Sequence, residues 1–169
     1  MDAELDVDHK LQTAGYGQYL STTCWYASYR MLYAWKKKDE SEILQKLSNA
    51  GLKIAELNKR GLYEEEFPTA ASALGMCGWR GRWVKDIDAE MVVHILKFYG
   101  PLFCATDYEG NARSGHAVVL VGYNSRMKTF KVYNPYNRSD PGNVDIDYWT
   151  LSKLHSDIHD SRFAVQAWQ

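Results

Sequence analysis

Cysteine is scarce in this sequence, and the three cysteines that occur do not form a recognisable structural set. Cys24, Cys77 and Cys104 contain no Cys-x-x-Cys spacing, and an odd, sparse set is not typical of a disulfide framework. The spacing argues against a disulfide-stapled fold and against a structural zinc site, and we expect neither a metal nor a cofactor. Cys77 and Cys104 stand among apolar residues, which is typical of inert buried thiols.

Net charge and long apolar runs are also lacking. The formal net charge of −1 provides no overall field to attract nucleic acid or an anionic membrane. No apolar run approaches the roughly 20 residues that cross a bilayer, and residues 1–8 are acidic, unlike a secretory signal peptide. We therefore expect no nucleic-acid or membrane partner, no signal peptide and no transmembrane segment. The sparse cysteines favour action in a reducing cytosol.

What the sequence does contain is enough apolar material for one domain with a buried core. It has 169 residues, of which 46% are hydrophobic and 24% are charged, the composition of an ordinary globular protein. The aromatic fraction of 14% is high, and large rings either fill a core or line a cleft. Because there is no internal repeat, we expect residues 1–169 to form a single domain.

The periodicity of the apolar residues changes near the middle of the chain. The first half predicts helices at about 24–37, 41–50, 53–60 and 68–74. The second half predicts one helix after Asp88, strands at 79–84, 102–106, 117–121, 129–133 and 163–168, loops at 108–115 and 134–143, and a short helix at 148–154. Helices followed by antiparallel strands indicate an α+β domain, with a helical lobe over about 18–76, a β-rich lobe over about 77–169 and a cleft between them.

Cys24 opens the first of these helices and is the candidate nucleophile. Ser21–Thr23 precede it as possible helix caps. The positive end of the helix dipole favours a thiolate over a thiol, so we expect the pKa of Cys24 to be depressed. The helix is apolar on most sides, which is typical of a buried central helix and leaves the thiol as its reactive feature.

His116 is the candidate base, and Asn134 is the candidate group that orients it. His116 stands directly before the strand at 117–121, although a histidine that merely ends a strand would look the same. If that strand pairs with 129–133 around a turn near Ser125, residues 116 and 134 lie opposite each other with Cβ atoms ~4.5–5.5 Å apart. A turn one residue longer or shorter would place Asn134 on the other face, so this pairing depends on the register.

Gln18 is the candidate for the oxyanion site. It lies six residues before Cys24, and its side-chain amide could donate to a substrate carbonyl oxygen as that oxygen becomes negative. The backbone N–H of Cys24, unused at the helix terminus, is the natural second donor. Gln12 is a rival for the same role, farther along the chain.

These residues together resemble the papain-like cysteine peptidases. The resemblance rests on four short blocks in order, Gln18-x5-Cys24-Trp25, Gly115-His116-Ala117-Val118, Val121-Gly122-Tyr123 and Asn134-Pro135. It is closest to the compact bacterial members, which include bacteriocin-processing peptidases and secreted effector or toxin peptidases. The sequence departs from papain at Ser21–Thr23, where a glycine is missing, and at Asn134-Pro135, which replaces Asn-Ser-Trp. Papain's own specificity is therefore a poor guide.

The resemblance implies a fold in which a central Cys-bearing helix packs on an antiparallel sheet, and a cysteine endopeptidase without a pro-segment. The site residues that it implies are a Cys24–His116–Asn134 triad, Gln18 in the oxyanion hole, and Trp25 and Gly115 as substrate contacts. It implies a protein or peptide substrate and, for a toxin delivered into the cytosol of a target cell, an inhibitory immunity protein. Aromatic residues near the cleft could restrict cleavage to small residues such as Gly-Gly; these are Trp25, Trp79, Trp83 and the 133–136 region.

Other readings remain open at this point. The same triad could serve a deamidase, a transglutaminase or an acyltransferase, and the same cleft could belong to a peptide-binding module without catalysis. The pair His155-x3-His159 has the spacing of metal ligands, but no glutamate-containing zinc motif accompanies it. The run Glu64–Glu66 is typical of a solvated helix edge, although it could border a basic substrate.

Overall fold

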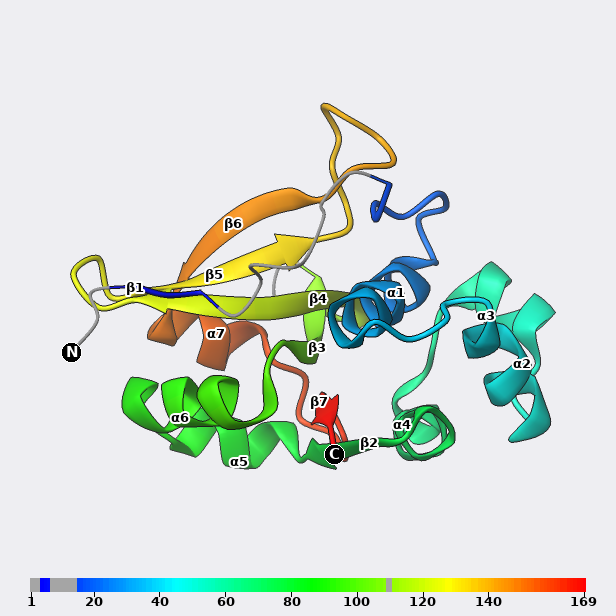
Figure 1. Ribbon diagram of the computed structural model, residues 1–169, viewed down its shortest axis with the longest axis horizontal. Helices are drawn as coiled ribbons and strands as arrows, with labels where there is room; N and C mark the ends of the chain where they lie inside the picture. Colours follow the sequence, from blue (N-terminus) through cyan, green and yellow to red (C-terminus); the bar gives the residue numbers. More distant parts are fainter. Residues whose placement is uncertain (1–3, 7–14, 109–110) are drawn as a thin grey trace.

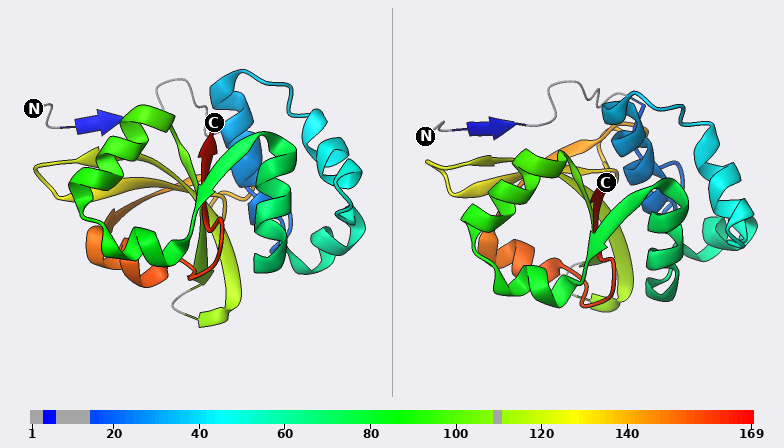
Figure 2. Two further views of the ribbon diagram at one scale, coloured as in Figure 1. Left: turned by 90° about the horizontal axis from the view of Figure 1, so that it is seen from below. Right: turned by 60° about the horizontal axis from the view of Figure 1, so that its bottom comes forward.

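The structure is a computed structural model that describes residues 4–6, 15–108 and 111–169. In these residues the protein is α+β, with one antiparallel sheet and helices on both of its faces (Figures 1 and 2). The helices are α1 (Cys24–Lys36), α2 (Glu42–Asn49), α3 (Ile54–Arg60), a 3-10 turn η1 (Glu64–Glu66), α4 (Phe67–Leu74), α5 (Gly81–Asp86), α6 (Ala89–Tyr99) and α7 (Leu151–Asp157). The strands are β1 (Glu4–Asp6), β2 (Met76–Trp79), β3 (Leu102–Tyr108), β4 (Asn111–Asn124), β5 (Thr129–Asn134), β6 (Asp145–Thr150) and β7 (Val165–Trp168).

The sheet runs in the order β2-β7-β3-β4-β5-β6, and every pair in it is antiparallel. Strand β1 pairs with the end of β4 beyond the part that pairs with β3, and there Asp6 lies opposite Gly122. A side chain at 122 would meet the Leu5 carbonyl oxygen at 2.4 Å, so this approach of two backbones requires glycine. Among the described residues, no helix is both long enough and apolar enough to span a bilayer.

Strand β4 is buried on both sides, which explains its uninterrupted run of apolar residues. Ala117, Val119 and Val121 belong to a core shared with α1 and α4, whereas Val118 and Leu120 belong to a second core shared with α6 and α7. Figure 2 shows the same division, with α1–α4 on one side of β3 and β4 and α5–α7 on the other. The prediction of a buried central helix is confirmed, since Tyr29, Met31, Leu32 and Tyr33 of α1 are 0% exposed.

Three sequence predictions in the second half were wrong. The segment 79–84 is not one strand, because β2 ends at Trp79 and the chain then turns into α5 at Gly81, whose N–H donates to the Ser161 carbonyl. The segment 108–115 is not simply a loop, because β3 continues to Tyr108 and β4 begins at Asn111. The helix expected at 148–154 begins only after Thr150, whose hydroxyl caps it by accepting from the Lys153 N–H, and β6 occupies the residues before it.

The hydroxyl groups before α1 do not cap it as predicted. Thr23 is the N-cap residue, but its side chain makes no capping hydrogen bond to the helix. Instead its Oγ1 accepts from the Leu20 N–H and donates to the Leu20 carbonyl, and the Thr22 hydroxyl donates to the Asn58 carbonyl. The hydroxyls therefore hold the preceding turn, and the first N–H groups of α1, those of Cys24 and Trp25, are directed at the Cys24 sulfur and not at a capping side chain.

A buried hydrogen bond ties α1 to the last strand and gives a test of this packing. The Tyr29 hydroxyl donates to Gln166 Oε1 at 2.8 Å, and both residues are 0% exposed. We expect Tyr29→Phe to lower the free energy of unfolding by about 1–3 kcal/mol, because it leaves the Gln166 oxygen buried without a donor. Denaturant unfolding measures this. Tyr26→Phe on the same helix is the matched control, and an equal effect of the two substitutions would contradict the prediction.

Candidate active site

A cleft of about 500 Å³ lies where the N-terminus of α1 meets β3 and β4. Its wall includes Cys24 from α1 and both Gly115 and His116 from β4. Residues 60–65, together with Phe67 and His159, also line it. The cleft therefore brings together the candidate nucleophile and the candidate base, which lie far apart in the sequence.

Cys24 is buried at the head of α1, with an exposed fraction of 7%. Burial raises the pKa of the Cys24 thiol to about 11, and backbone hydrogen bonds from Ala117, Trp25 and Cys24 itself act in the opposite direction. The expectation of a depressed pKa is therefore wrong for this structure, because loss of water around the thiolate outweighs the donors at the helix terminus. The bond from Ala117 also places the sulfur beside the residue that follows His116.

His116 is hydrogen bonded to Asn134 as the sequence predicts, with a distance of 2.6 Å between His116 Nε2 and Asn134 Oδ1. An amide oxygen only accepts, so Nε2 carries the hydrogen and donates it. Burial lowers the pKa of His116, whereas the bond to Asn134 and the negative charge of Asp147 act in the opposite direction. Burial thus favours neutral forms of both Cys24 and His116 in the free protein.

The register that joins these two residues differs from the predicted one. Near the turn, Asn124 pairs with Thr129 and Gly122 with Lys131, but a β-bulge between Leu120 and Gly122 then shifts the pairing by one residue. Val119 pairs with Tyr133, and the next step places Asn134 beside Val118. Asn134 is therefore diagonal to His116, not directly opposite it, and diagonal neighbours on one face remain within reach of each other.

The bulge decides which face Asn134 occupies. Without the extra residue, Asn134 would lie opposite Val119, whose side chain belongs to the core beneath α1. With it, Asn134 shares the face of Val118 and His116, since side chains alternate along a strand. The β-bulge, which the sequence did not predict, therefore restores the predicted contact between His116 and Asn134.

Asp147 on β6 is a site residue that sequence reasoning missed. Its Oδ2 accepts a hydrogen bond from Asn134 Nδ2 at 3.2 Å, and the Tyr136 N–H donates to Asn134 Oδ1 at 3.0 Å. The pairing of β5 with β6 brings Asp147 opposite Val132, diagonal to Asn134. The segment 148–154 was read as a helix, so the strand that carries Asp147 to this position was not recognised.

Gln18 lies near the head of α1 but does not line the cleft. Its Nε2 donates to the Leu20 carbonyl at 2.9 Å, and its backbone N–H donates to the Pro135 carbonyl at 2.9 Å. Gly17 is equally close to the 135–143 loop, and a side chain there would meet Gly142 at 2.5 Å. The loop that carries Gln18 is thus docked against the segment that follows Asn134. The rival Gln12 lies outside the described residues.

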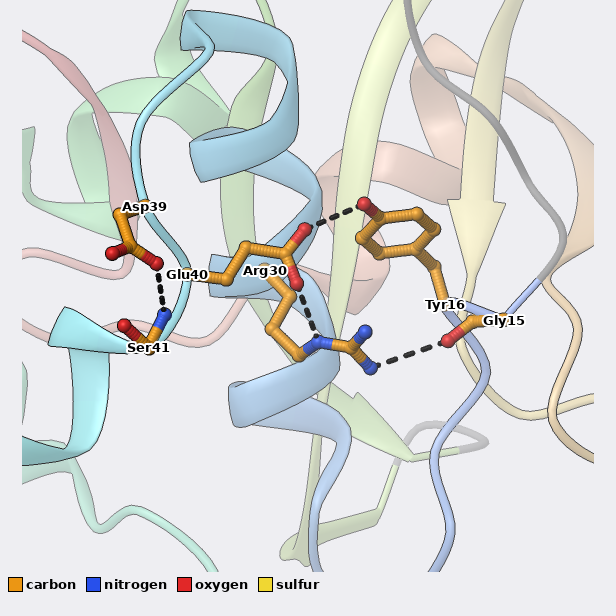
Figure 3. A network of polar contacts seen from close by, with 6 residues as sticks. All are labelled: Gly15, Tyr16, Arg30, Asp39, Glu40 and Ser41. Carbon is orange, nitrogen blue, oxygen red and sulfur yellow. Dashed lines mark hydrogen bonds and ion pairs between the residues drawn. The ribbon is translucent and has the colours of Figure 1, made fainter.

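A charged network fastens the same loop to α1, as Figure 3 shows. Arg30 Nε contacts Glu40 Oε2 at 3.0 Å, and Arg30 donates to the Gly15 carbonyl at 3.2 Å. The Tyr16 hydroxyl donates to Glu40 Oε1 at 2.5 Å, and its pKa is raised to about 12, first by burial and then by Glu40. Through Arg30, these contacts tie the segment that precedes Gln18 to the helix that begins at Cys24.

The two predicted substrate contacts differ in how much surface they offer. Gly115 is exposed beside His116, and a side chain built there would meet nothing within 4 Å. Trp25 lines the cleft but is only 1% exposed, so it supports the wall more than it presents a surface. Trp79 and Trp83 do not narrow the cleft as predicted, because Trp79 packs on the core on the opposite face of the sheet and stacks with Trp83 there.

Of the glutamates and histidines singled out in the sequence, Glu64, Glu65 and His159 line the cleft. Glu66 is paired with Arg60 at 2.7 Å. His159 lies with Nδ1 at 3.4 Å from Glu64. His155 and His159 do not share one helix, since α7 ends at Asp157. Within the described residues, no three His, Cys, Asp or Glu side chains are grouped to hold a metal.

A second cavity of about 480 Å³ meets the cleft at Thr106 and His116. It lies on the side of His116 that faces Asn134 and Asp147, and Cys24 is not part of its wall. Most of its charged lining residues are acidic, with Asp107, Asp140, Asp145, Asp147 and Asp157 against Arg138 and Lys153. His116 therefore stands between a cleft that contains the thiol and a cavity that contains the carboxylates.

Comparison with known families agrees with the chemistry of this cleft. Residues 1–149 match the sequence profile of a family described as papain-like cysteine protease AvrRpt2. The chain belongs to this family. The match covers α1, β4 and β5, and so every segment that carries a predicted site residue. The protein is a papain-like cysteine protease, as the resemblance in the sequence implies. No curated protein matches the chain.

The buried thiol of this family member gives a direct test of its resting state. We expect iodoacetamide to alkylate Cys24 of the free protein slowly at mildly acidic pH and faster as the pH rises through the alkaline range. The reason is that the thiolate is the nucleophile and burial holds the Cys24 pKa at about 11. Mass spectrometry of the labelled peptide measures the rate, and Cys24→Ala identifies labelling at Cys77 and Cys104. A rate that is already maximal below neutral pH would contradict this expectation.

Proposed function

We propose that the protein is a cysteine endopeptidase in which Cys24 is the nucleophile, His116 the base and Asn134 the group that orients His116. The observation that carries the proposal is the 2.6 Å bond between His116 Nε2 and Asn134 in the cleft that also contains Cys24. Because Nε2 holds its hydrogen toward Asn134, proton exchange with the thiol goes through Nδ1. The family assignment supports the same chemistry.

The proposed reaction has two halves. His116 Nδ1 takes the thiol proton as the Cys24 sulfur attacks the peptide carbonyl carbon, and the carbonyl oxygen becomes negative. The carbon–nitrogen bond then breaks, the proton passes from Nδ1 to the leaving amine, and a thioester remains. Water attacks the thioester with His116 as base, which releases the acid and returns the proton to the thiol.

The neutral pair fits this sequence of steps. Burial raises the pKa of Cys24 and lowers that of His116, so the charges form when a substrate occupies the cleft and its oxyanion is stabilised. The backbone N–H groups of Cys24 and Trp25, which bond to the Cys24 sulfur in the free protein, would turn to that oxyanion in the proposed reaction. Gln18 would join them after its amide leaves the Leu20 carbonyl, a contact made within its own loop.

The thioester is shared with the alternative reactions. A deamidase would use the same steps on a side-chain amide, and a transglutaminase or acyltransferase would replace water with another acceptor. Peptide fragments indicate proteolysis, whereas a mass change of about one unit on an intact target indicates deamidation. We favour hydrolysis because the family to which the chain belongs is a protease family. A peptide-binding module without catalysis would leave every target intact.

The substrate is proposed only by class. A protein segment in extended form suits an open cleft that runs past Gly115, and an exposed glycine beside His116 leaves room for the substrate backbone. The proposal that cleavage is restricted to small residues such as Gly-Gly is not supported by Trp79 and Trp83, because they lie on the opposite face of the sheet from α1. It rests on Trp25 and the 133–136 region. A role as an effector or toxin with an inhibitory immunity protein follows from the family likeness alone.

The first test is removal of the thiol. We expect Cys24→Ala to abolish peptide-bond cleavage and to change Tm by no more than about 3 °C, because the substitution removes one buried atom and leaves the helix intact. Incubation with a cell lysate, followed by mapping of new protein N-termini by mass spectrometry, measures cleavage and identifies the substrate. Cys77→Ala is the matched control and should cleave like the natural protein. Retained cleavage by Cys24→Ala would refute the proposal.

The second test concerns the oxyanion site. We expect Gln18→Ala to lower kcat by about 100-fold, the usual effect of losing one oxyanion donor, with little change in KM. Kinetics on a peptide identified in the lysate experiment measure both constants. Gln18→Glu serves as a comparison, since it keeps the size but adds a charge that repels the oxyanion. An unchanged kcat in Gln18→Ala would leave the backbone N–H groups as the oxyanion donors and would overturn the role of Gln18.

A further inference from the structure

The amide of Asn134 could in principle face His116 in either of two orientations. A carboxamide has nearly the same shape when its oxygen and nitrogen are exchanged, so shape alone does not select one orientation. The oxygen accepts from His116 Nε2 and from the Tyr136 N–H, and the nitrogen donates to Asp147 Oδ2. These partners agree on one orientation, and Asp147 contributes the acceptor that the nitrogen needs.

The orientation of that amide determines which nitrogen of His116 acts as the base. With the oxygen toward Nε2, the hydrogen stays on Nε2 and Nδ1 is the basic nitrogen. If the amide turned over, its nitrogen would donate to Nε2, and the hydrogen of the neutral ring would move to Nδ1. The ring could then no longer take a proton from Cys24 through Nδ1, and the wrong tautomer is a severe defect in a triad.

Asp147 also supplies a charge that the neutral asparagine lacks. A carboxylate that accepts from the amide nitrogen polarises the amide and makes its oxygen a better acceptor for an imidazolium. The side chain of Asp147 is only partly exposed, on a strand whose register with β5 holds it diagonal to Asn134. The positive charge that would form on His116 during catalysis is therefore stabilised by the negative charge of Asp147, with Asn134 between the two.

Other charged groups also face His116 and must be separated from Asp147 in any test. They line the two cavities and come from every element around them: Cys24 on α1, Arg60 on α3, Glu64 and Glu65 on η1, Asp107 on β3, Arg138 and Asp140 after β5, Asp145 on β6, Lys153 and Asp157 on α7, and His159 after α7. Lys153 is paired with Asp157 at 2.7 Å, and His159 Nε2 lies 3.8 Å from Asp107. Among the carboxylates of the second cavity, Asp147 is the one with a hydrogen bond to Asn134.

We propose that Asp147 is a positioning residue for the proposed protease reaction, which holds the Asn134 amide in the orientation that keeps Nδ1 of His116 as the base. This inference rests on the proposed roles of Cys24, His116 and Asn134. Asp147 does not touch the thiol, and it acts through Asn134. The neutral orienting residue of this triad thus has a carboxylate behind it, in the order His116, Asn134, Asp147.

The test compares Asp147→Asn with Asp145→Asn. Both substitutions remove one negative charge from the same strand and the same cavity. Asp145 pairs with Asn134 in the strand ladder, but the Asn134 amide donates its side-chain hydrogen bond to Asp147. An amide at 147 can present either its oxygen or its nitrogen to Asn134, so the substitution removes both the charge and the fixed acceptor. We expect Asp147→Asn to lower kcat by about 10- to 100-fold with little change in KM, the range for weakening one charge-assisted hydrogen bond. Asp145→Asn should retain the natural kcat. Equal losses in the two variants would overturn the proposal, because a general effect of cavity charge would then explain them.

A reversed pair gives a second, independent arm. In the double variant Asn134→Asp with Asp147→Asn, a carboxylate would accept directly from Nε2 and an amide would stand behind it. We expect the kcat of this double variant to be at least tenfold higher than the kcat of Asp147→Asn. Asn134→Ala, which removes the amide itself, should lose as much kcat as Asp147→Asn or more without abolishing turnover. Failure of the reversed pair to recover activity would overturn the proposal.

Titration of His116 by NMR tests the placement without turnover. The Asp147 carboxylate favours the imidazolium, so its removal should lower the His116 pKa, and Asp145→Asn should lower it less. The Nδ1 and Nε2 shifts should report hydrogen on Nε2 in the natural protein and a mixture in Asp147→Asn. An unchanged tautomer and pKa would refute the role of Asp147 even if the protein is an active protease. If the protein cleaves nothing while these shifts occur, the proposed reaction fails and the positioning contact stands.

Discussion

The central constraint in this protein is that strand β4 is buried on both faces. One set of its side chains packs under α1, and the alternate set packs under α6 and α7, so a shift of one residue would exchange the two sets and repack both cores at once. Because both faces are buried, the position of His116 along β4 relative to the neighbouring strands is fixed. This double burial also fixes where the head of α1 lies, since the Cys24 sulfur takes a hydrogen bond from the Ala117 backbone on the same strand.

The candidate site is formed where the N-terminus of α1 meets β4 and its neighbours β5 and β6. The β-bulge in β4 returns Asn134 to the face of His116, and the antiparallel neighbour β6 then brings Asp147 behind Asn134. The loop with Gln18 is held between α1 and the segment after Asn134 by backbone contacts and by the Arg30–Glu40 pair. The groups around the cleft are thus positioned by regular elements, which suits a site whose tautomers and amide orientations must be kept.

Burial has an electrostatic consequence that the helix dipole does not reverse. The thiol of Cys24 and the ring of His116 are both shielded from water, so burial disfavours the charged form of each. Asn134 and Asp147 act against this on the imidazole, and backbone N–H groups act against it on the sulfur. In the proposed reaction, these compensating groups are already in place for the charges that would develop on the sulfur and the imidazole.

The amino-acid sequence by itself determined the buried helix that begins at Cys24, the apolar strand after His116 and the α+β class, because hydrophobic periodicity and helix or turn residues are local signals. It also identified His116 and Asn134 as partners, although by a register that was wrong by two residues. Only the tertiary structure decided the bulge that brings Asn134 to the correct face, the strand that carries Asp147, the inward position of Trp25 and the raised pKa of Cys24. Each of these depends on which segments pack together and exclude water, and such contacts between distant residues leave no periodic trace in the chain.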